Sequence, residues 1–319
     1  MEYTLREICS HFRVDTDIES YGNGHINDTY ICRTDPAFIL QRINTSIFKN
    51  PDEVMKNIVG VTSFLSRKIK ALGGDPKRET MTVIKTEDGK SFYRTPDGAC
   101  FRMYTYVPDT VTHETAETPE IFYSAAKAFG KFQRMLDGYP ADTLFETIKD
   151  FHNTTERVNQ LNDAVKNNAA GRLSEVGAEL EEAKRLSKYA PVITDKIASG
   201  EIPLRVTHND TKLNNVLFDK TTDKGLCVID LDTVMPGSAL YDFGDALRFG
   251  ASNAPEDETD LSKVWFDLDK FEAFTKGFLS ETAECLTRAE IDLLPESALI
   301  MTYECGIRFL ADHLNGDTY

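Results

Sequence analysis

Two stretches of sequence, THNDTKLNNVLFD (207–219) and VIDLDT (228–233), decide how this 319-residue chain is interpreted. Asp210 and Asn215 lie five residues apart in a loop-like segment before a short apolar strand, and Asp230 ends the next apolar strand after a polar turn. Because a tight hairpin brings its flanking segments together, we expect Asp230 to lie beside Asp210 and Asn215. The sequence therefore predicts one cluster of two carboxylates and an amide.

Such a cluster suits phosphoryl transfer from ATP. One carboxylate accepts the proton of the substrate hydroxyl, while an amide and a second carboxylate hold Mg²⁺ against the phosphates. Magnesium prefers oxygen ligands and uses only one or two carboxylates. Each residue alone is typical of a turn or a strand end. Their combined spacing favours one functional cluster over three unrelated structural residues.

Charge and composition exclude several classes of protein. The 36 Lys and Arg residues against 52 Asp and Glu residues give a net charge of −16, which argues against nucleic-acid and anionic-membrane partners. The sequence contains no apolar run of the length that a membrane span needs, and its first residues do not resemble a secretory signal. Its six cysteines form no CxxC pair, so we expect reduced thiols and a cytoplasmic protein.

The order of the predicted elements indicates an α+β chain in two parts. Three short strands flank the glycine turn at 22–24 and include FILQRIN (38–44), and a helix begins at Pro51 with Asn50 as its cap. A hairpin is expected around Asp88 and Gly89, followed by the strand CFRMYTYV (100–107). After Pro108 the periodicity is mostly helical. We therefore expect a boundary near residue 107.

The quoted loops carry a resemblance to a known family. HNDTKLNNVLFD and VIDLD resemble the catalytic and metal loops of the aminoglycoside phosphotransferase-like kinases, HGDxxxxNxLxD and xIDxx. The resemblance implies a protein-kinase-like bilobal fold, an antiparallel sheet plus helix followed by a mostly helical lobe. Residues 1–107 would form the nucleotide-binding lobe and 108–319 the catalytic and substrate-binding lobe.

Longer strings are similar to one group within that family, the N-acetylhexosamine 1-kinases. They are CVIDLDTVMPGSALYDFGDALRFGA, GNGHINDTY, FILQRIN and RFLADHLNGDTY. This group phosphorylates the anomeric hydroxyl of N-acetylglucosamine and N-acetylgalactosamine. The resemblance implies that Asp210 is the catalytic base that accepts from a sugar hydroxyl, and that Asn215 and Asp230 are the magnesium ligands. Asp232, two residues after Asp230, either joins the metal ligands or is a solvated loop acid, and both interpretations stay open.

The substrate side rests on residues far apart in the sequence. Phe249 is expected to pack against the sugar ring unless it is a core aromatic, and Arg308 to bind sugar oxygens or phosphate unless it forms a surface salt bridge. His25, in the glycine turn, would reach the phosphates or a sugar hydroxyl unless it is simply exposed. Tyr319 is a further substrate candidate, and Asp242 resembles an aspartate that braces the catalytic loop.

The nucleotide side departs from the kinase pattern. Gly22 and Gly24 form a glycine turn that can cover phosphates, but the third glycine of G-x-G-x-x-G is absent. Gln41 occupies the position of the lysine that contacts the α- and β-phosphates in kinases. Arg42 replaces that lysine only if the strand register differs by one. The residues expected to hold adenine through their backbone are Tyr106 and Val107.

The sequence thus predicts an ATP- and Mg²⁺-dependent kinase with a small-molecule sugar acceptor. Two rivals stay open. One is another small-molecule kinase of the superfamily, with a homoserine, choline or aminoglycoside substrate. The other is a catalytically inactive nucleotide-binding protein, which the missing lysine favours and the intact Asp210, Asn215 and Asp230 oppose. The oligomeric state is not predicted.

Overall fold

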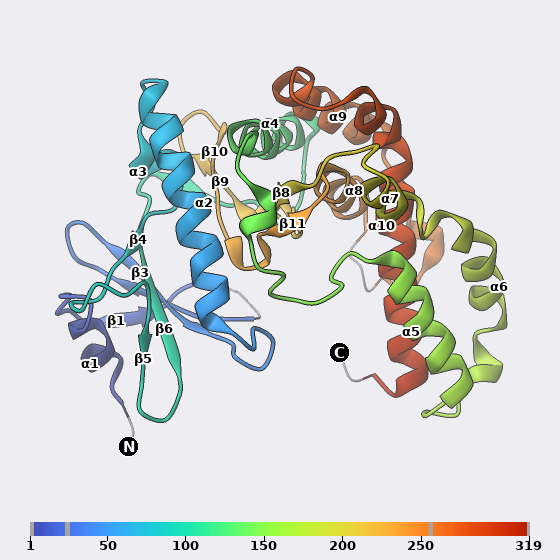
Figure 1. Ribbon diagram of the computed structural model, residues 1–319, viewed down its shortest axis with the longest axis horizontal. Helices are drawn as coiled ribbons and strands as arrows, with labels where there is room; N and C mark the ends of the chain where they lie inside the picture. Colours follow the sequence, from blue (N-terminus) through green and yellow to red (C-terminus); the bar gives the residue numbers. More distant parts are fainter. Residues whose placement is uncertain (1–2, 23–25, 255–257, 318–319) are drawn as a thin grey trace.

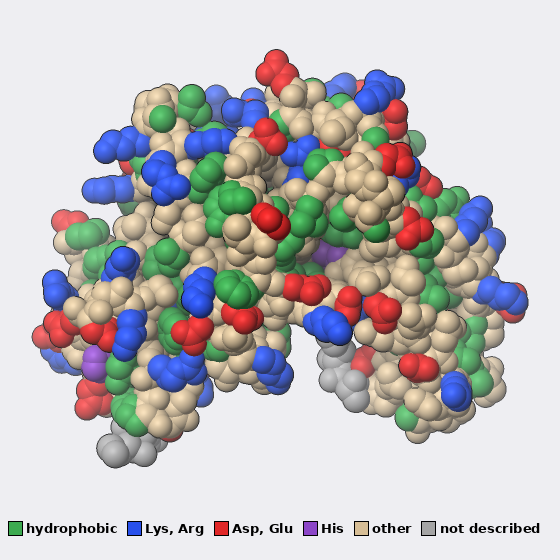
Figure 2. Space-filling view, viewed as in Figure 1, with side chains coloured by type: hydrophobic (Ala, Val, Ile, Leu, Met, Phe, Trp, Pro, Cys, Tyr) green, Lys and Arg blue, Asp and Glu red, His purple; other side chains and the backbone are tan. Residues whose placement is uncertain are grey.

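The computed structural model describes residues 3–22, 26–254 and 258–317, and Figure 1 shows two parts joined through the segment after residue 105. One part holds a six-stranded antiparallel sheet with helices on it, and the other is mostly helical. The space-filling view shows the division as an indentation along the lower edge (Figure 2). The change of composition predicted near residue 107 falls between the end of one strand at Thr105 and the start of the next at Thr110.

The first part contains α1 (Leu5–Ser10), α2 (Pro51–Ala71) and α3 (Pro76–Glu79). Its strands run in the order β1-β2-β3-β6-β4, and β5 also pairs with β6. Their bounds are β1 Ile18–Ser20, β2 Asp28–Cys32, β3 Phe38–Ile43, β4 Val83–Ile84, β5 Tyr93–Arg94 and β6 Cys100–Thr105. In the register of β3 and β6, Gln41 lies opposite Arg102 and Arg42 opposite Phe101.

The second part is built around helices. They are α4 Pro119–Leu136, α5 Thr154–Asn167, α6 Gly177–Leu186, α7 Val192–Ala198, α8 Ala239–Gly250, α9 Leu268–Thr282 and α10 Arg288–Asn315. Its strands form a sheet of order β10-β9-β7 and a pair β11-β8, with bounds β7 Thr110–Val111, β8 Arg205–Thr207, β9 Val216–Asp219, β10 Gly225–Val228 and β11 Met235–Gly237. No helix in the described ranges is long and apolar enough to cross a membrane.

The predicted apolar faces form the core. The predicted face of α2 is buried at Val54, Ile58, Val61 and Leu65, and one hydrophobic cluster continues from α2 into α4 and α8. Burying each large apolar side chain stabilises the fold by about 1.5–3 kcal/mol. A separate cluster joins α5 and α6 to α10. The core thus supports both sides of the indentation.

One local prediction was confirmed in part, one was wrong, and one helix was missed. Asn50 is the residue before α2, as predicted, but its side chain makes no capping hydrogen bond. The strands on either side of Asp88 and Gly89 do not pair with each other, because β4 and β5 both pair with β6 along one edge. β4 and β5 therefore form one edge of the sheet, and residues 85–92 are a loop between them. The helix α1 was not predicted, although Thr4 and Glu7 form a capping box at its start.

Candidate active site

The loop after β8 presents Asp210 and Asn215 together, as predicted. The Asn215 side-chain Nδ2 donates to the Asp210 carboxylate Oδ2 at 3.1 Å and to the Asp210 carbonyl at 2.8 Å. Lys212 Nζ lies 3.4 Å from the other carboxylate oxygen, and the Asp210 side chain is 27% exposed. The sequence interpretation had overlooked Lys212, although a cation two residues after a candidate base was visible. The carboxylate is therefore oriented, reachable and flanked by a positive charge.

Buried acceptors from α8 fix the backbone of this loop. Asp242, 2% exposed, accepts from the backbone N–H groups of His208 at 3.0 Å and Asn209 at 2.8 Å. Asn209 has a φ of 67°, in the left-handed region that asparagine tolerates better than most residues. Asp245 accepts from the N–H of Thr211 at 3.0 Å. The bracing role expected for Asp242 is confirmed.

Asp230 is brought to the same place by His208. His208 Nε2 lies 2.9 Å from the carbonyl oxygen of Ile229, and His208 Nδ1 accepts from the Asp210 N–H at 3.3 Å. The N–H of Ile229 also donates to the carbonyl of Asn215 at 2.9 Å. Asp230 follows with a φ of 55°. The catalytic and metal loops are therefore joined through their backbones.

The pKa of Asp230 determines whether its carboxyl group is charged and able to bind a metal ion. Burial, and then the negative charges of Asp232 and Asp210, raise the pKa of Asp230 to about 7. Because Asn215 uses its Nδ2 as a donor to Asp210, its amide oxygen is left as the acceptor. An amide oxygen beside mutually repelling carboxylates fits a divalent cation that prefers oxygen ligands.

The described residues contain no convergent group of three His, Cys, Asp or Glu side chains suited to a metal. Magnesium in proteins often binds through one or two protein ligands, with phosphates and water completing its coordination. The residues present are therefore compatible with Mg²⁺ at Asn215 and Asp230.

A second buried pair supports the catalytic loop from α10. His152 Nδ1 lies 2.7 Å from Glu304 Oε1, and its Nε2 lies 3.0 Å from the carbonyl of Asn209. Both ring nitrogens face acceptors, which requires the charged imidazolium. Burial opposes that charge, but Glu304 and Asp245 outweigh it and raise the pKa of His152. The sequence interpretation had overlooked this pair, because no local motif joins residues 152 and 304.

The β3 position of the missing lysine is linked to an arginine on β6. Arg102 is 1% exposed and donates from Nε and Nη2 to Gln41 Oε1 at 3.0 and 2.9 Å. Its Nη1 pairs with Asp232 Oδ1. Arg42 points to the other face of the sheet and lies 3.6 Å from the exposed Asp28. The register condition under which Arg42 would replace the lysine is therefore not met.

Asp232 is not a solvated loop acid, because its side chain is buried and paired. It lies in a 3₁₀ turn, Leu231–Thr233, so it does not follow Asp230 along a strand. It is 4% exposed, and its second oxygen accepts from Asn27 Nδ2 at 2.7 Å. The burial and both pairings connect Asp232 to the sheet of the first part.

Comparison with known proteins adds to this geometry. Residues 17–274 match the phosphotransferase enzyme family. The chain belongs to that family. Solved structures with similar folds are those of small-molecule kinases, and their identities of 12–17% bear on the fold alone.

Three of these structures illustrate the range. Spectinomycin phosphotransferase in complex with ADP and spectinomycin matches with a TM-score of 0.58 and 16% identity, over 97% of this chain and 85% of that one. A microcompartment-associated aminopropanol kinase matches with a TM-score of 0.54 and 17% identity, over 98% of this chain and 97% of that one. Amicoumacin kinase in complex with AMP-PNP and Ca²⁺ matches with a TM-score of 0.55 and 12% identity, over 94% of this chain and 88% of that one. The phosphotransferase therefore has the expected protein-kinase-like fold, with an antiparallel sheet in its first lobe and a mostly helical second lobe.

The linker of the phosphotransferase lies where an adenine site is expected. The Tyr106 N–H donates to the Ala37 carbonyl at 3.0 Å, so that donor is already used. Val107 is buried, and its carbonyl accepts from Thr110 Oγ1 at 2.8 Å. Tyr21, next to Gly22, meets Tyr106 edge-on with ring centroids 6.1 Å apart. Gly22 has a φ of 75°, which explains a glycine there, whereas Gly24 and His25 lie outside the described residues.

The two acceptor candidates within the described ranges lie on helices that reach the catalytic loop. Phe249 is half-buried on α8, one turn beyond Asp245. Arg308 is half-buried on α10, one turn beyond Glu304. Each therefore shares a helix face with a residue that supports the loop. Tyr319 lies outside the described residues.

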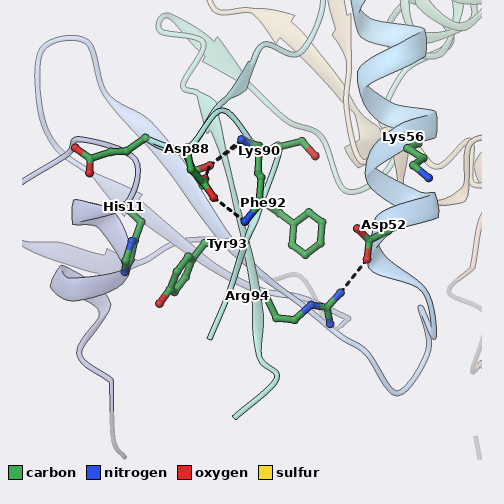
Figure 3. A pocket seen from close by; sticks show the side chains of 11 residues that line it. His11, Asp52, Lys56, Asp88, Lys90, Phe92, Tyr93 and Arg94 are labelled. Carbon is green, nitrogen blue, oxygen red and sulfur yellow. Dashed lines mark hydrogen bonds and ion pairs between the residues drawn. The ribbon is translucent and has the colours of Figure 1, made fainter. Parts of the chain in front are cut away.

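Cavity size alone would place the site wrongly. A cavity of about 760 Å³ lies between the end of α1, residues 86–94 and the start of α2, away from the catalytic loop (Figure 3). Two ion pairs already lie in its lining, Arg94 with Asp52 at 3.0 Å and Lys90 with Asp88 at 2.6 Å. A cavity of about 150 Å³ adjoins the catalytic loop and is lined partly by Asn209. The functional assignment rests on the loop's chemistry.

Proposed function

We propose that this phosphotransferase is a cytoplasmic ATP-dependent kinase that phosphorylates the anomeric (C1) hydroxyl of N-acetylglucosamine or N-acetylgalactosamine. The observation that carries the kinase assignment is the Asp210 carboxylate, hydrogen-bonded to Asn215 and flanked by Lys212. The choice of sugar rests on the sequence strings shared with the N-acetylhexosamine 1-kinases. Residues 1–107 bind the nucleotide, and 108–319 supply the catalytic loop and the acceptor site.

In this proposal the chain's own residues position the reactants. Asp210 orients the sugar hydroxyl and accepts its proton as the oxygen attacks the γ-phosphorus of ATP. The bond between the γ-phosphorus and the β–γ bridging oxygen breaks, and ADP leaves. Lys212 offsets the negative charge beside the transferring phosphoryl group. A bound Mg²⁺, held by Asn215 and Asp230, would neutralise charge on the β- and γ-phosphate oxygens. Positioning and charge stabilisation supply most of the rate enhancement in this class of reaction.

The remaining contacts of the proposal follow from the same arrangement. Gly22, with Gly24, covers the phosphates, and the linker residues Tyr106 and Val107 border the adenine. Phe249 and Arg308 face the acceptor. The resemblance adds His25 and Tyr319 to the acceptor site.

An acceptor screen tests the proposal. ADP release would be measured with N-acetylglucosamine, N-acetylgalactosamine, glucose, galactose, ethanolamine, choline and an aminoglycoside, each with ATP and Mg²⁺. We expect the highest kcat/KM with an N-acetylhexosamine and a product phosphorylated at C1. The methyl glycoside of N-acetylglucosamine is the matched control, because its anomeric oxygen is blocked and it should give no turnover.

One alternative keeps specific support. The net charge of −16 suits a cationic acceptor, and similar folds occur in an aminopropanol kinase and a spectinomycin phosphotransferase. A higher kcat/KM with an amino alcohol or aminoglycoside than with either N-acetylhexosamine would replace the sugar assignment. Nucleotide binding without transfer to any acceptor would instead indicate an inactive binding protein.

A further inference from the structure

Arg102 is a buried cation at the junction of the two lobes. It is among the largest fully buried side chains of the described residues, and its guanidinium carbon lies 5.3 Å from the centre of the Tyr104 ring. Burying an arginine costs several kcal/mol unless its hydrogen bonds are satisfied. Here the guanidinium meets Gln41 on one side and Asp232 on the other. Removing Arg102 alone would leave the buried Asp232 without its positively charged partner.

Gln41 orients this cation. Its Oε1 accepts two N–H groups of Arg102, and its Nε2 donates to Thr29 Oγ1 at 3.1 Å. The amide can make both sets of bonds in only one orientation, since the oxygen cannot donate and the nitrogen cannot accept. A lysine at this position would set a second positive charge against Arg102. Gln41 is thus matched to an arginine on the neighbouring strand and is unsuited to contact phosphate itself.

Asp232 transmits the position of Arg102 to the metal loop. Its two oxygens bind Arg102 on β6 and Asn27 at the end of the glycine turn, and Asn27 Oδ1 accepts from the Asn44 N–H at 3.0 Å. Three segments of the nucleotide-binding lobe therefore converge on a residue two positions from Asp230. The charges around the metal loop are consistent with this link. Arg102 and Lys212 partly offset the negative charges of three clustered acids, Asp210, Asp230 and Asp232.

We propose that Arg102, oriented by Gln41 and acting through Asp232, is a positioning residue that holds the metal loop against the nucleotide-binding lobe for Mg-nucleotide. Arg102 lies on the strand next to β3, where kinases carry the lysine that contacts the phosphates, and it acts by a different route, through the metal loop. The proposal rests on the proposed use of ATP and metal, but it does not depend on which acceptor is phosphorylated.

The test measures nucleotide affinity by calorimetry in the full-length chain, without acceptor. Mg·ADP and ADP in EDTA would be titrated into the unmutated protein, Arg102→Lys, Arg102→Met and Gln41→Lys. We expect Arg102→Met to weaken Mg·ADP binding about 10- to 100-fold, the range for residues that orient metal ligands. Binding of metal-free ADP should fall much less. Arg102→Lys should lie between, since lysine keeps the charge but loses the planar array of donors.

Two further variants separate this role from general destabilisation. Arg205→Lys is the matched control, because Arg205 is also largely buried and pairs with the buried Glu290 at 2.6 Å, away from the metal loop. It should leave the ratio of Mg·ADP to ADP affinity unchanged. If Arg102→Met does not fold, Arg102→Met/Asp232→Asn removes both charges together and should show the same loss of Mg·ADP affinity.

The outcomes are distinct. Gln41→Lys should weaken Mg·ADP binding, and tighter binding would overturn the proposal by showing that position 41 contacts phosphate. Arg102→Lys, folded and within twofold of the unmutated affinity, would overturn it as well. Binding of Mg·ADP by the unmutated protein without turnover of any acceptor would contradict only the proposed function. Absence of nucleotide binding by the unmutated protein would overturn both.

Discussion

The buried pair of His152 and Glu304 makes a prediction whose sign depends on pH. Their side chains are 6% and 1% exposed, and Thr154 Oγ1 donates to the second oxygen of Glu304 at 2.6 Å. Glu304→Gln keeps the shape and removes the charge. Breaking a buried ion pair by changing one partner costs about 3–5 kcal/mol. That is a large share of the roughly 5–15 kcal/mol by which proteins are usually stable.

The pH dependence follows from the directions of the two shifts. The pKa of His152 is raised in the folded protein above its ordinary value of 6.5, so its contribution is complete below that value and disappears as pH rises through the folded pKa. The pKa of Glu304 is lowered from 4.5 despite its burial, because His152 and Thr154 favour the carboxylate. Its contribution is complete above that value and disappears as pH falls through the folded pKa. The pair therefore stabilises the fold most between pH 4.5 and 6.5.

Urea unfolding at pH 6 and at a series of higher pH values measures this difference. We expect Glu304→Gln to lose about 3–5 kcal/mol at pH 6. As pH rises through the folded pKa of His152, the loss should fall toward the roughly 1 kcal/mol of an ordinary hydrogen bond. His113→Gln is the matched control, since His113 pairs with Asp223 at 2.8 Å where Asp223 is 51% exposed, and it should cost under about 1 kcal/mol. A loss near 1 kcal/mol for Glu304→Gln already at pH 6 would refute a charged His152.

Three more predictions concern the loops and lobes. Asp242→Asn should lower the free energy of unfolding in urea by about 3 kcal/mol and reduce kcat, because an amide cannot accept from Gln133, His208 and Asn209 together. An unchanged kcat would show that catalysis does not need these hydrogen bonds. Asn57→Leu should destabilise the fold by about 2–4 kcal/mol, because the Asn57 side chain hydrogen-bonds to the Phe145 backbone and the Val234 carbonyl across the lobes. A loss of stability below about 1 kcal/mol would contradict the importance of these hydrogen bonds. Excess chelator should abolish transfer and excess Mg²⁺ should restore it; appreciable transfer in chelator would contradict metal dependence.

Local patterns predicted the contact between Asp210 and Asn215 because it depends on short spacing in the sequence. Asp210 and Asn215 are five residues apart, so one loop conformation brings them together, and the hairpin β9–β10 returns the chain to Asp230. The apolar face of α2 followed from helical periodicity for the same local reason.

Long-range contacts could not be predicted in this way. Arg102 and Asp232 lie 130 residues apart, and His152 and Glu304 lie 152 apart, so only strand register and helix packing reveal them. The hairpin around Asp88 and Gly89 failed because a good turn sequence does not determine which strands pair. The arginine within the apolar run CFRMYTYV was a sequence feature that could have pointed to the buried contacts of Arg102.

The most direct test of the central claim is the turnover of Asp210→Asn. This variant keeps the side-chain shape but cannot accept the proton, so general-base and orientation effects predict a loss in kcat of about 10²–10⁴-fold. Mg·ADP affinity, measured by calorimetry on the same preparation, should stay within about threefold of the unmutated value, since the proposed nucleotide and metal contacts do not need this carboxylate. Near-normal turnover by Asp210→Asn, with intact nucleotide binding, would contradict the assignment of Asp210 as the base.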